Sequence, residues 1–99
     1  MSYTLKITPT AFSDIQNGID YYQSQQKGLG AKFADHVQTV LGKIETLPLS
    51  ASIAYADIRY KKIYKFPYVI LYVVKGSTVI ILRIFNTHQN PSFEGSEEM

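Results

Sequence analysis

The chain has 99 residues, of which 45% are apolar, 13% aromatic and 18% charged, and this composition is that of one soluble globular domain rather than a disordered or fibrous protein. The absence of cysteine excludes disulfide frameworks, thiolate zinc sites and a cysteine nucleophile, and the short length disfavours an enzyme with a deep cleft. The formal net charge of +2 hides a separation of sign, because residues 58–93 carry six Lys and Arg and no acid, whereas residues 1–57 carry four Lys and five acids. Such a separation indicates an anionic partner for the second half, unless the lysines only keep a sheet soluble and protect its edges.

The first 26 residues predict a strand and then a helix. Residues 3–8 alternate apolar and polar side chains, as a half-buried strand does. Thr8 then supplies a capping hydroxyl, Pro9 suits a first helical turn, and apolar side chains at helical spacing predict a helix over about 9–26. No basic segment followed by an apolar stretch opens the chain, so we expect no secretory signal and a cytoplasmic protein.

A second helix is predicted by the apolar residues between Phe33 and Leu47. They follow the polar run 24–28 in a new helical register, and Pro48 ends them. Two helices joined by a short turn form an αα-hairpin, and neither can bury its apolar stripe alone, so both need a sheet to pack on. Residues 49–56 are small and irregular, and we expect them to form a connecting loop.

The remaining residues predict three strands with short links, which favours an antiparallel meander. These strands cover residues 58–64, 68–74 and 78–85. Lys75 and Gly76 interrupt the most apolar stretch of the chain, so that stretch predicts two strands of a hairpin rather than a membrane span. We therefore expect an α+β fold of order β-α-α-β-β-β, a helical hairpin on one face of a small antiparallel sheet whose other face is basic and tyrosine-rich. We expect one domain over residues 1–99, with a flexible acidic tail over about 92–99.

Arg83 stands out in the last predicted strand because its neighbours are apolar. Ile80, Leu82 and Ile84 share one face of that strand. If this set packs under the helices, Arg83 projects from the opposite, open face of the sheet. An arginine within an apolar strand face needs solvent or a partner, so Arg83 is either a functional contact or an ion pair with a helix acid.

The element order, the capped first helix, the end of the second helix at Leu47-Pro48, and the runs Phe66–Tyr72 and Ile81–Phe85 together resemble the RelE/ParE superfamily. These proteins are the toxins of bacterial type II toxin–antitoxin pairs and are often called plasmid stabilisation proteins. The resemblance covers about residues 3–91. It implies a cognate antitoxin as the principal partner, a toxin–antitoxin hetero-oligomer, and no membrane partner.

RelE-type members of the superfamily cut messenger RNA on the ribosome. This reaction requires a base for the 2′-OH proton, a cation for the phosphate and an acid for the leaving oxygen. Arg59, Arg83 and His88 are the candidates for these roles here. The sequence departs from the RelE pattern, because Val69 stands in place of an arginine and His88-Gln89 in place of a Lys-Arg pair. An endoribonuclease is therefore the alternative hypothesis.

ParE-type members poison DNA gyrase by binding and have no known catalytic residues of their own. This branch resembles the chain more closely, through Arg83 inside the last strand and the turn Asn86–Gln89, which contains His88. The chain departs from it at Gln89–Pro91, where members often carry basic residues. The first hypothesis is a ParE-like toxin that inhibits an essential target such as gyrase by binding. A degenerate toxin, kept only as an antitoxin-binding subunit, is a further alternative.

The candidate target-binding residues are cations and aromatic side chains of the second half, namely Arg59, Lys61, Lys62, Tyr64, Lys65, Arg83 and His88. Tyrosines interleaved with lysine and arginine suit contacts with a nucleic-acid backbone and its bases, but tyrosine is also a routine strand and interface residue. His36 lies beside the apolar stripe of the second helix and is expected to be structural. Two separated histidines, no cysteine and no clustered acids predict no metal site and no cofactor.

Overall fold

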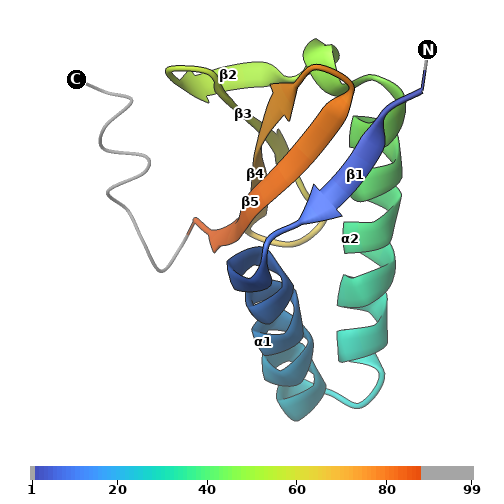
Figure 1. Cartoon of the computed structure of the whole chain (residues 1–99). Helices are drawn as coiled ribbons and strands as arrows, with labels where there is room; N and C mark the ends of the chain where they lie inside the picture. The colour runs from blue at the N-terminus through green and yellow to red at the C-terminus, as the bar shows by residue number, and fades with distance from the viewer. Residues whose placement is uncertain (1, 88–99) are drawn as a thin grey trace.

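Two helices lie against one face of a five-stranded sheet in the computed structural model, which describes residues 2–87 (Figure 1). In chain order the elements are β1 (Thr4–Ile7), α1 (Pro9–Gln25), α2 (Leu29–Thr46), a 3-10 helix (Pro48–Ser50), β2 (Ser52–Tyr55), β3 (Ile58–Lys62), β4 (Tyr68–Lys75) and β5 (Thr78–Asn86). The predicted α+β fold with a helical hairpin on a sheet is confirmed. The predicted tail over 92–99 lies outside the described residues.

The sheet is mixed rather than wholly antiparallel, which corrects one detail of the expectation. Its strand order is β1-β5-β4-β3-β2, and β1 runs parallel to β5, with Leu5 beside Val79. The other neighbouring strands pair antiparallel. The apolar periodicity predicts each strand, but it does not indicate which edge of the sheet the first strand joins. The sequence therefore does not predict the parallel pairing of β1 with β5.

The segment predicted as a loop over 49–56 contains the short strand β2, and this is a second correction. Ser52 pairs with Tyr60 and Ile53 with Arg59, so β2 forms the outer edge of the sheet beside β3. Ile53 and Tyr55 are exposed. A four-residue edge strand with exposed apolar side chains has no buried face to impose alternation, and its sequence signal is weak for that reason.

Local chemistry explains where the helices begin. Thr8 caps α1, because its Oγ1 accepts a hydrogen bond from the Ala11 N–H at 3.0 Å, and Pro9 follows in the first turn. Between the helices, Gly28 holds φ at 87°, a left-handed conformation that glycine adopts without steric cost. The chain therefore reverses within three residues and α2 packs beside α1. None of the helices within residues 2–87 is long and apolar enough to cross a membrane.

The core lies between the helical hairpin and the sheet, and Phe33 of α2 is at its centre. A Cβ atom at Gly18 would lie 2.5 Å from Phe33 Cε2, so the glycine lets α1 and α2 approach closely over this ring. The rings of Tyr22, Phe66 and Tyr68 surround Phe33, with centroids 5.3, 5.2 and 4.9 Å away. Aromatic contacts of this kind therefore join both helices to the β3–β4 turn and to β4.

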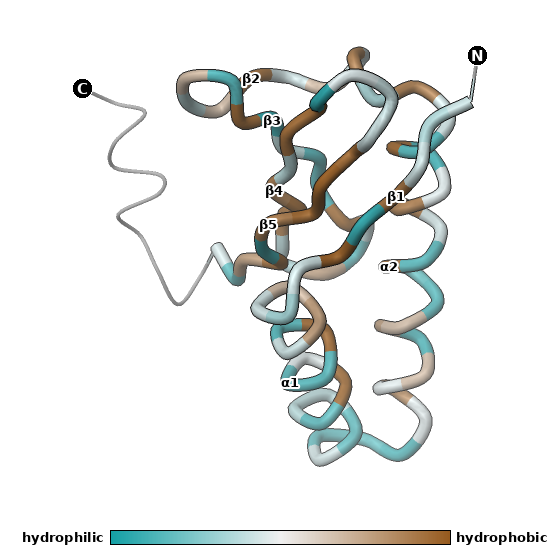
Figure 2. The backbone as a smooth tube through the Cα atoms, in the orientation of Figure 1, coloured by the Kyte–Doolittle hydropathy of each residue, from teal (hydrophilic) through white to brown (hydrophobic). Residues whose placement is uncertain are grey.

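The side of β5 that faces the helices differs from the expectation. Figure 2 shows hydrophobic residues concentrated along β4 and β5. Val79, Ile81 and Ile84 belong to the core, in place of the predicted Ile80, Leu82 and Ile84. Tyr72 of β4 pairs with Ile81 but Leu71 pairs with Arg83, so Leu82 is an extra residue. This bulge shifts the alternation by one residue, which a strict two-residue period cannot predict.

Candidate functional site

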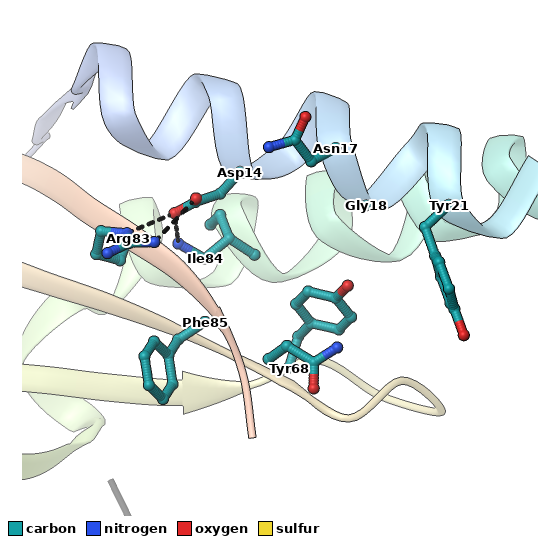
Figure 3. Close-up of a pocket in the computed structure, with 9 residues that line it drawn as sticks. Asp14, Asn17, Gly18, Tyr21, Tyr68, Arg83, Ile84 and Phe85 are labelled. Carbon is teal, nitrogen blue, oxygen red and sulfur yellow. Dashed lines mark hydrogen bonds and ion pairs between the residues drawn. The ribbon is translucent and has the colours of Figure 1, made fainter. Parts of the chain in front are cut away.

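The hollow beside Arg83 lies between α1 and the C-terminal half of β5 and has a volume of about 370 Å³ (Figure 3). We call it the Arg83 hollow. Its lining residues come from α1, β4 and β5 and comprise Asp14, Asn17, Gly18, Tyr21, Tyr68, Arg83, Ile84, Phe85 and Asn86. The two elements meet here because the first turns of α1 follow directly on β1, the strand that pairs with β5.

Asp14 holds Arg83 in a two-point ion pair. Arg83 Nε donates to Asp14 Oδ2 at 2.7 Å and Arg83 Nη2 donates to Oδ1 at 3.1 Å, a fork geometry that only arginine supplies (Figure 3). The Ile84 backbone N–H donates to Asp14 Oδ2 at 3.0 Å. One carboxylate therefore fixes both the arginine side chain and the backbone of the strand that carries it.

The edge of β5 explains why an acid is needed at position 14. β1 ends at Ile7, so among residues 2–87 no strand lies beside the last residues of β5 on that edge. The Thr8 N–H donates to the Ile81 carbonyl at 3.1 Å, and the Thr8 hydroxyl donates to the Leu82 carbonyl at 3.1 Å. Asp14 then accepts the Ile84 N–H. Thr8 and Asp14 thus supply hydrogen-bond partners for the part of the β5 backbone that lies beyond the end of β1.

The ion pair keeps the Arg83 guanidinium protonated, and the Asp14 carboxylate balances its charge. The hydrogen bond that Arg83 donates to Asp14 raises the pKa of the Arg83 guanidinium above its usual value, and this effect outweighs the desolvation that would lower it. The Asp14 side chain is 13% exposed and the Arg83 side chain 48% exposed. The guanidinium is therefore accessible to a partner on one side while its charge is balanced on the other.

The remaining walls of the Arg83 hollow are polar and aromatic. Asn17 and Tyr21 come from α1, Tyr68 from β4 and Asn86 from the end of β5. Amide and phenol groups of this kind can hydrogen bond a partner's backbone or side chains. Among the described lining residues no histidine or second carboxylate accompanies Arg83, so the walls supply hydrogen bonds rather than an acid–base pair.

The predicted basic residues of β3 are divided between two faces of the sheet. Arg59 lies beside Tyr72 and Lys61 beside Ile70, on the helix side, whereas Lys62 lies beside Val69 on the other. The expectation of one continuous basic, tyrosine-rich face is thus wrong. Successive residues along a strand point to opposite faces of the sheet, so the neighbouring cations Lys61 and Lys62 cannot share one face.

Arg59 is engaged by the backbone at the far edge of the sheet. Its Nη1 donates to the Ala51 carbonyl at 2.8 Å and to the Leu49 carbonyl at 3.3 Å. These bonds fasten the segment before β2 to β3. Arg59 therefore stabilises this edge of the fold, and β4 lies between its strand and the strand of Arg83.

Tyr64 and Lys65 lie in the β3–β4 turn, away from both arginines. Lys65 Nζ is 5.7 Å from the centroid of the Tyr64 ring, and Tyr64 is 70% exposed. The His36 ring of α2 lies 6.1 Å from Tyr64 and 5.4 Å from Phe66. The predicted site residue His88 falls outside the described residues. Within residues 2–87 no three His, Asp or Glu side chains are placed to hold a metal ion.

Asp14, Asn17 and Tyr21 were not identified as site residues from the sequence. Asp14 is one of several acids in the first half, and 69 residues separate it from Arg83. The one available signal was Arg83 itself, since an arginine among apolar strand residues requires a partner. The identity of that partner depends on how α1 packs beside β5, which no local pattern records.

A family model described as the ParE toxin of the type II toxin–antitoxin system parDE matches residues 5–91. No curated protein matches the chain at the level of sequence. A chain of the chromosomal ParDE system from P. aeruginosa is 23% identical with a TM-score of 0.65, and the match covers 86% of this chain and 96% of that one.

Two further solved structures share the fold. A chain of the RelBE2 toxin–antitoxin complex from Mycobacterium tuberculosis is 23% identical, has a TM-score of 0.62, and is matched over 87% of this chain and 99% of that one. The YoeB dimer from Staphylococcus aureus is 15% identical, has a TM-score of 0.59, and is matched over 86% of this chain and 97% of that one.

Proposed function

The chain belongs to the ParE toxin family of type II toxin–antitoxin systems, and from this premise we propose that it arrests growth by binding an essential enzyme, with DNA gyrase as the first candidate, and not by cleaving RNA. A cognate antitoxin would neutralise it in a hetero-oligomer. Binding demands an accessible surface with fixed polar groups, whereas cleavage demands a converging set of proton-transfer groups and cations.

The ion pair between Asp14 and Arg83 is the observation that carries this proposal. A catalytic arginine must turn its guanidinium toward a phosphate as negative charge develops there. Arg83 instead directs two of its nitrogens to an internal carboxylate, and Arg59 directs its Nη1 to two backbone carbonyls. With both candidate cations engaged by the fold and held on different strands, the arrangement favours recognition over RNA cleavage.

Charge supports an antitoxin as the second partner. Residues 58–87 carry six cations and no acid, and two of those cations, Arg83 and Lys75, are ion-paired within the described chain. The remaining positive charge favours an acidic partner segment. The Mycobacterium tuberculosis neighbour was solved as a toxin–antitoxin complex, which is consistent with a partner of this class.

Expression of the protein without its antitoxin tests the proposal, with DNA breaks and messenger RNA integrity measured in the same cells. We expect growth arrest with DNA breaks and intact messages. Cuts at defined codon positions in ribosome-bound messages would contradict the proposal and establish the endoribonuclease alternative. Normal growth in the presence of folded protein would favour the degenerate toxin.

Variants at position 83 add a matched control. Arg83→Ala removes the exposed guanidinium and should abolish growth arrest, whereas Lys75→Ala removes an exposed lysine that is ion-paired elsewhere and should leave arrest unchanged. Circular dichroism of both purified variants is the control for folding. Equal toxicity of the two variants would show that the Arg83 hollow does not contact the target.

A further inference from the structure

A second hollow lies between the helical hairpin and the β3–β4 turn and has a volume of about 530 Å³. We call it the Lys65 groove. Its apolar lining comes from Tyr22 and Leu29 of the helices and from Phe66 and Pro67 of the turn. It shares no lining residue with the Arg83 hollow. The site described above therefore leaves this groove without an assigned role.

The described part of the chain ends beside the Lys65 groove. The Thr87 N–H and the Thr87 hydroxyl both donate to the Pro67 carbonyl, at 2.9 and 3.1 Å, and Pro67 lines the groove. Residues 88–99 follow Thr87 in the sequence and lie outside the described residues. An extended chain spans about 3.3–3.6 Å per residue, so a segment tethered at Thr87 can reach the groove. Such a tether gives the segment a local concentration on the order of millimolar, at which even a weak contact forms.

The acidic tail, residues 92–99, combines negative charge with an aromatic side chain. Its charged side chains are Glu94, Glu97 and Glu98, and its aromatic side chain is Phe93. The match to the family model ends at residue 91, so membership of the family does not account for these four residues. A segment of this composition suits a surface that joins an apolar floor to a positive rim.

The rim of the Lys65 groove is positively charged. Lys32 of α2 and Lys65 of the turn line the groove, against one lining carboxylate, that of Asp35. Both lysines are exposed, and neither takes part in the ion pairs found within residues 2–87. The rim therefore attracts negative charge that the described acids do not supply.

The aromatic floor of the Lys65 groove is held by the core beneath it. Tyr22 and Phe66 touch edge to face with centroids 4.8 Å apart, and Phe66 also packs against Phe33, which is fully buried. The His36 ring lies 5.4 Å from Phe66 and forms part of the wall. Rings held in this way do not need to rearrange, so little free energy is lost in ordering the floor when a further ring such as Phe93 covers it.

The Arg83 hollow also borders the last described residues, but its electrostatics suit an acidic segment less well. Asp14 already balances the Arg83 charge through two hydrogen bonds of 2.7 and 3.1 Å. A carboxylate brought to this hollow would meet the Asp14 carboxylate beside a cation that is already paired. The Lys65 groove instead offers two unpaired lysines against one carboxylate, so the charges favour the groove.

We propose that the acidic tail occupies the Lys65 groove of its own chain, with Phe93 against Tyr22 and Phe66 and the glutamate carboxylates beside Lys32 and Lys65. The tail covers the apolar floor in the free protein, and a partner that binds in the groove has to displace it. The inference is independent of the proposed function, because it concerns the free protein and requires no target.

A spin label in the tail tests this position in the full chain. The chain has no cysteine, so Ser96→Cys provides a single attachment site for a nitroxide. We expect the amide NMR signals of Lys32, His36 and Lys65 to lose most of their intensity relative to the sample with reduced label. The signal of Gly76, in the hairpin at the other end of β4, should keep its intensity. A mixture of spin-labelled protein with isotope-labelled protein that carries no nitroxide should show no loss, because docking occurs within one chain.

Charge variants of the spin-labelled protein test the contacts. Lys65→Glu and Lys32→Glu should each lower the docking equilibrium constant about tenfold through like-charge repulsion, and so restore most of the His36 signal. Lys65→Arg keeps the charge and should keep the loss of signal. Lys6→Glu makes the same charge change on an exposed residue of β1 and should change nothing.

Three results would overturn the inference. One is full intensity of the groove signals in the spin-labelled protein. A second is a loss of intensity that Lys65→Glu and Lys32→Glu leave unchanged, or that Lys6→Glu relieves to the same extent. The third is an equal loss in the mixed sample, which would assign the groove to the tail of a second copy.

Discussion

The Arg83 hollow and the Lys65 groove both place positive charge beside aromatic rings, but they treat that charge differently. Arg83 meets a carboxylate from α1 in two hydrogen bonds, and the same carboxylate completes the edge of β5. Lys65 has no acid partner among the described residues and lies over a tyrosine ring. In the first site the charge of the cation is therefore balanced within the fold, whereas in the second it is available to a partner.

The number of basic residues in the second half of the chain therefore does not indicate how many of them have their charge available to a partner. A paired arginine recognises a partner through its remaining exposed nitrogen atoms and its shape, with little net charge. Unpaired lysines contribute long-range attraction that salt screens. The two sites share the Phe33 ring as a support, since it contacts Tyr68 of the Arg83 hollow and both Tyr22 and Phe66 of the Lys65 groove.

Removal of that shared support should have the largest effect. We expect Phe33→Ala to lower the free energy of unfolding by about 3–5 kcal/mol, because it leaves a cavity under Gly18 and the surrounding rings. Denaturant unfolding measures the loss. If the fold tolerates the change, both sites should weaken together, and a variant that loses one site alone would break the comparison.

Asp14→Asn should have the next largest effect. It leaves the Arg83 guanidinium unbalanced and weakens the acceptor for the Ile84 N–H, and we expect a loss of about 1–3 kcal/mol in unfolding free energy. Asp20→Asn, which alters an exposed acid on the same helix, is the control and should change stability by less than about 0.5 kcal/mol. Equal effects of the two variants would mean that Asp14 is a surface acid like any other.

Tyr72 of β4, which lies beside Arg59 of β3, provides a third test. Its buried hydroxyl donates to the Pro48 carbonyl. Burial raises the pKa of the Tyr72 phenol above its usual value of 10.0, and the nearby Arg59 charge opposes that rise. Above pH 10 the unfolded chain loses the phenolic proton while the folded chain keeps it, so stability should fall as pH rises. Burial also raises the pKa of Tyr22 and adds to this loss.

Tyr72→Phe separates the two tyrosines. At pH 7 it should cost about 1 kcal/mol through the lost hydrogen bond. Above pH 10 it should flatten the decline, because one of the two groups that drive it is gone. Thermal unfolding at several pH values measures both effects. An unchanged slope in the variant would assign the alkaline loss to other groups.

The smallest effect is expected at the exposed ion pair between Lys75 and Asp57. Its Nζ–Oδ2 distance is 3.7 Å, and the side chains are 64% and 70% exposed. Lys75→Ala should change the free energy of unfolding by at most about 0.5 kcal/mol, because water screens the pair. A loss as large as that of Asp14→Asn would contradict the claim that burial and the fork geometry distinguish the Arg83 pair.

The fold was predictable from the sequence where apolar side chains repeat with a regular period. Thr8-Pro9 and the spacing after it defined α1, and Pro48 marked the end of α2. The parallel pairing of β1, the edge strand β2 and the bulge at Leu82 were missed, because each depends on neighbours distant in the sequence. The same reason hid the candidate site.

Arg83 was recognised as an unusual residue, but its partner was open between solvent, target and a helix acid. The structure shows that the partner is Asp14, which reaches Arg83 because α1 packs beside β5. Lys65 was predicted as one cation in a basic face, and the structure instead places it at a groove with Phe66. Strand alternation could have indicated that Arg59, Lys61 and Lys62 would divide between faces.

The most direct test of the central claim is to map, residue by residue, where replacement of the three glutamates of the acidic tail by glutamine perturbs the amide NMR spectrum of the protein. The account predicts that shifts concentrate at Lys32, His36 and the β3–β4 turn, and that Asn17 and Ile84 beside the paired Arg83 change little. Shifts centred on the Arg83 hollow, with none at the Lys65 groove, would contradict the division between a cation held by the fold and cations available to a partner.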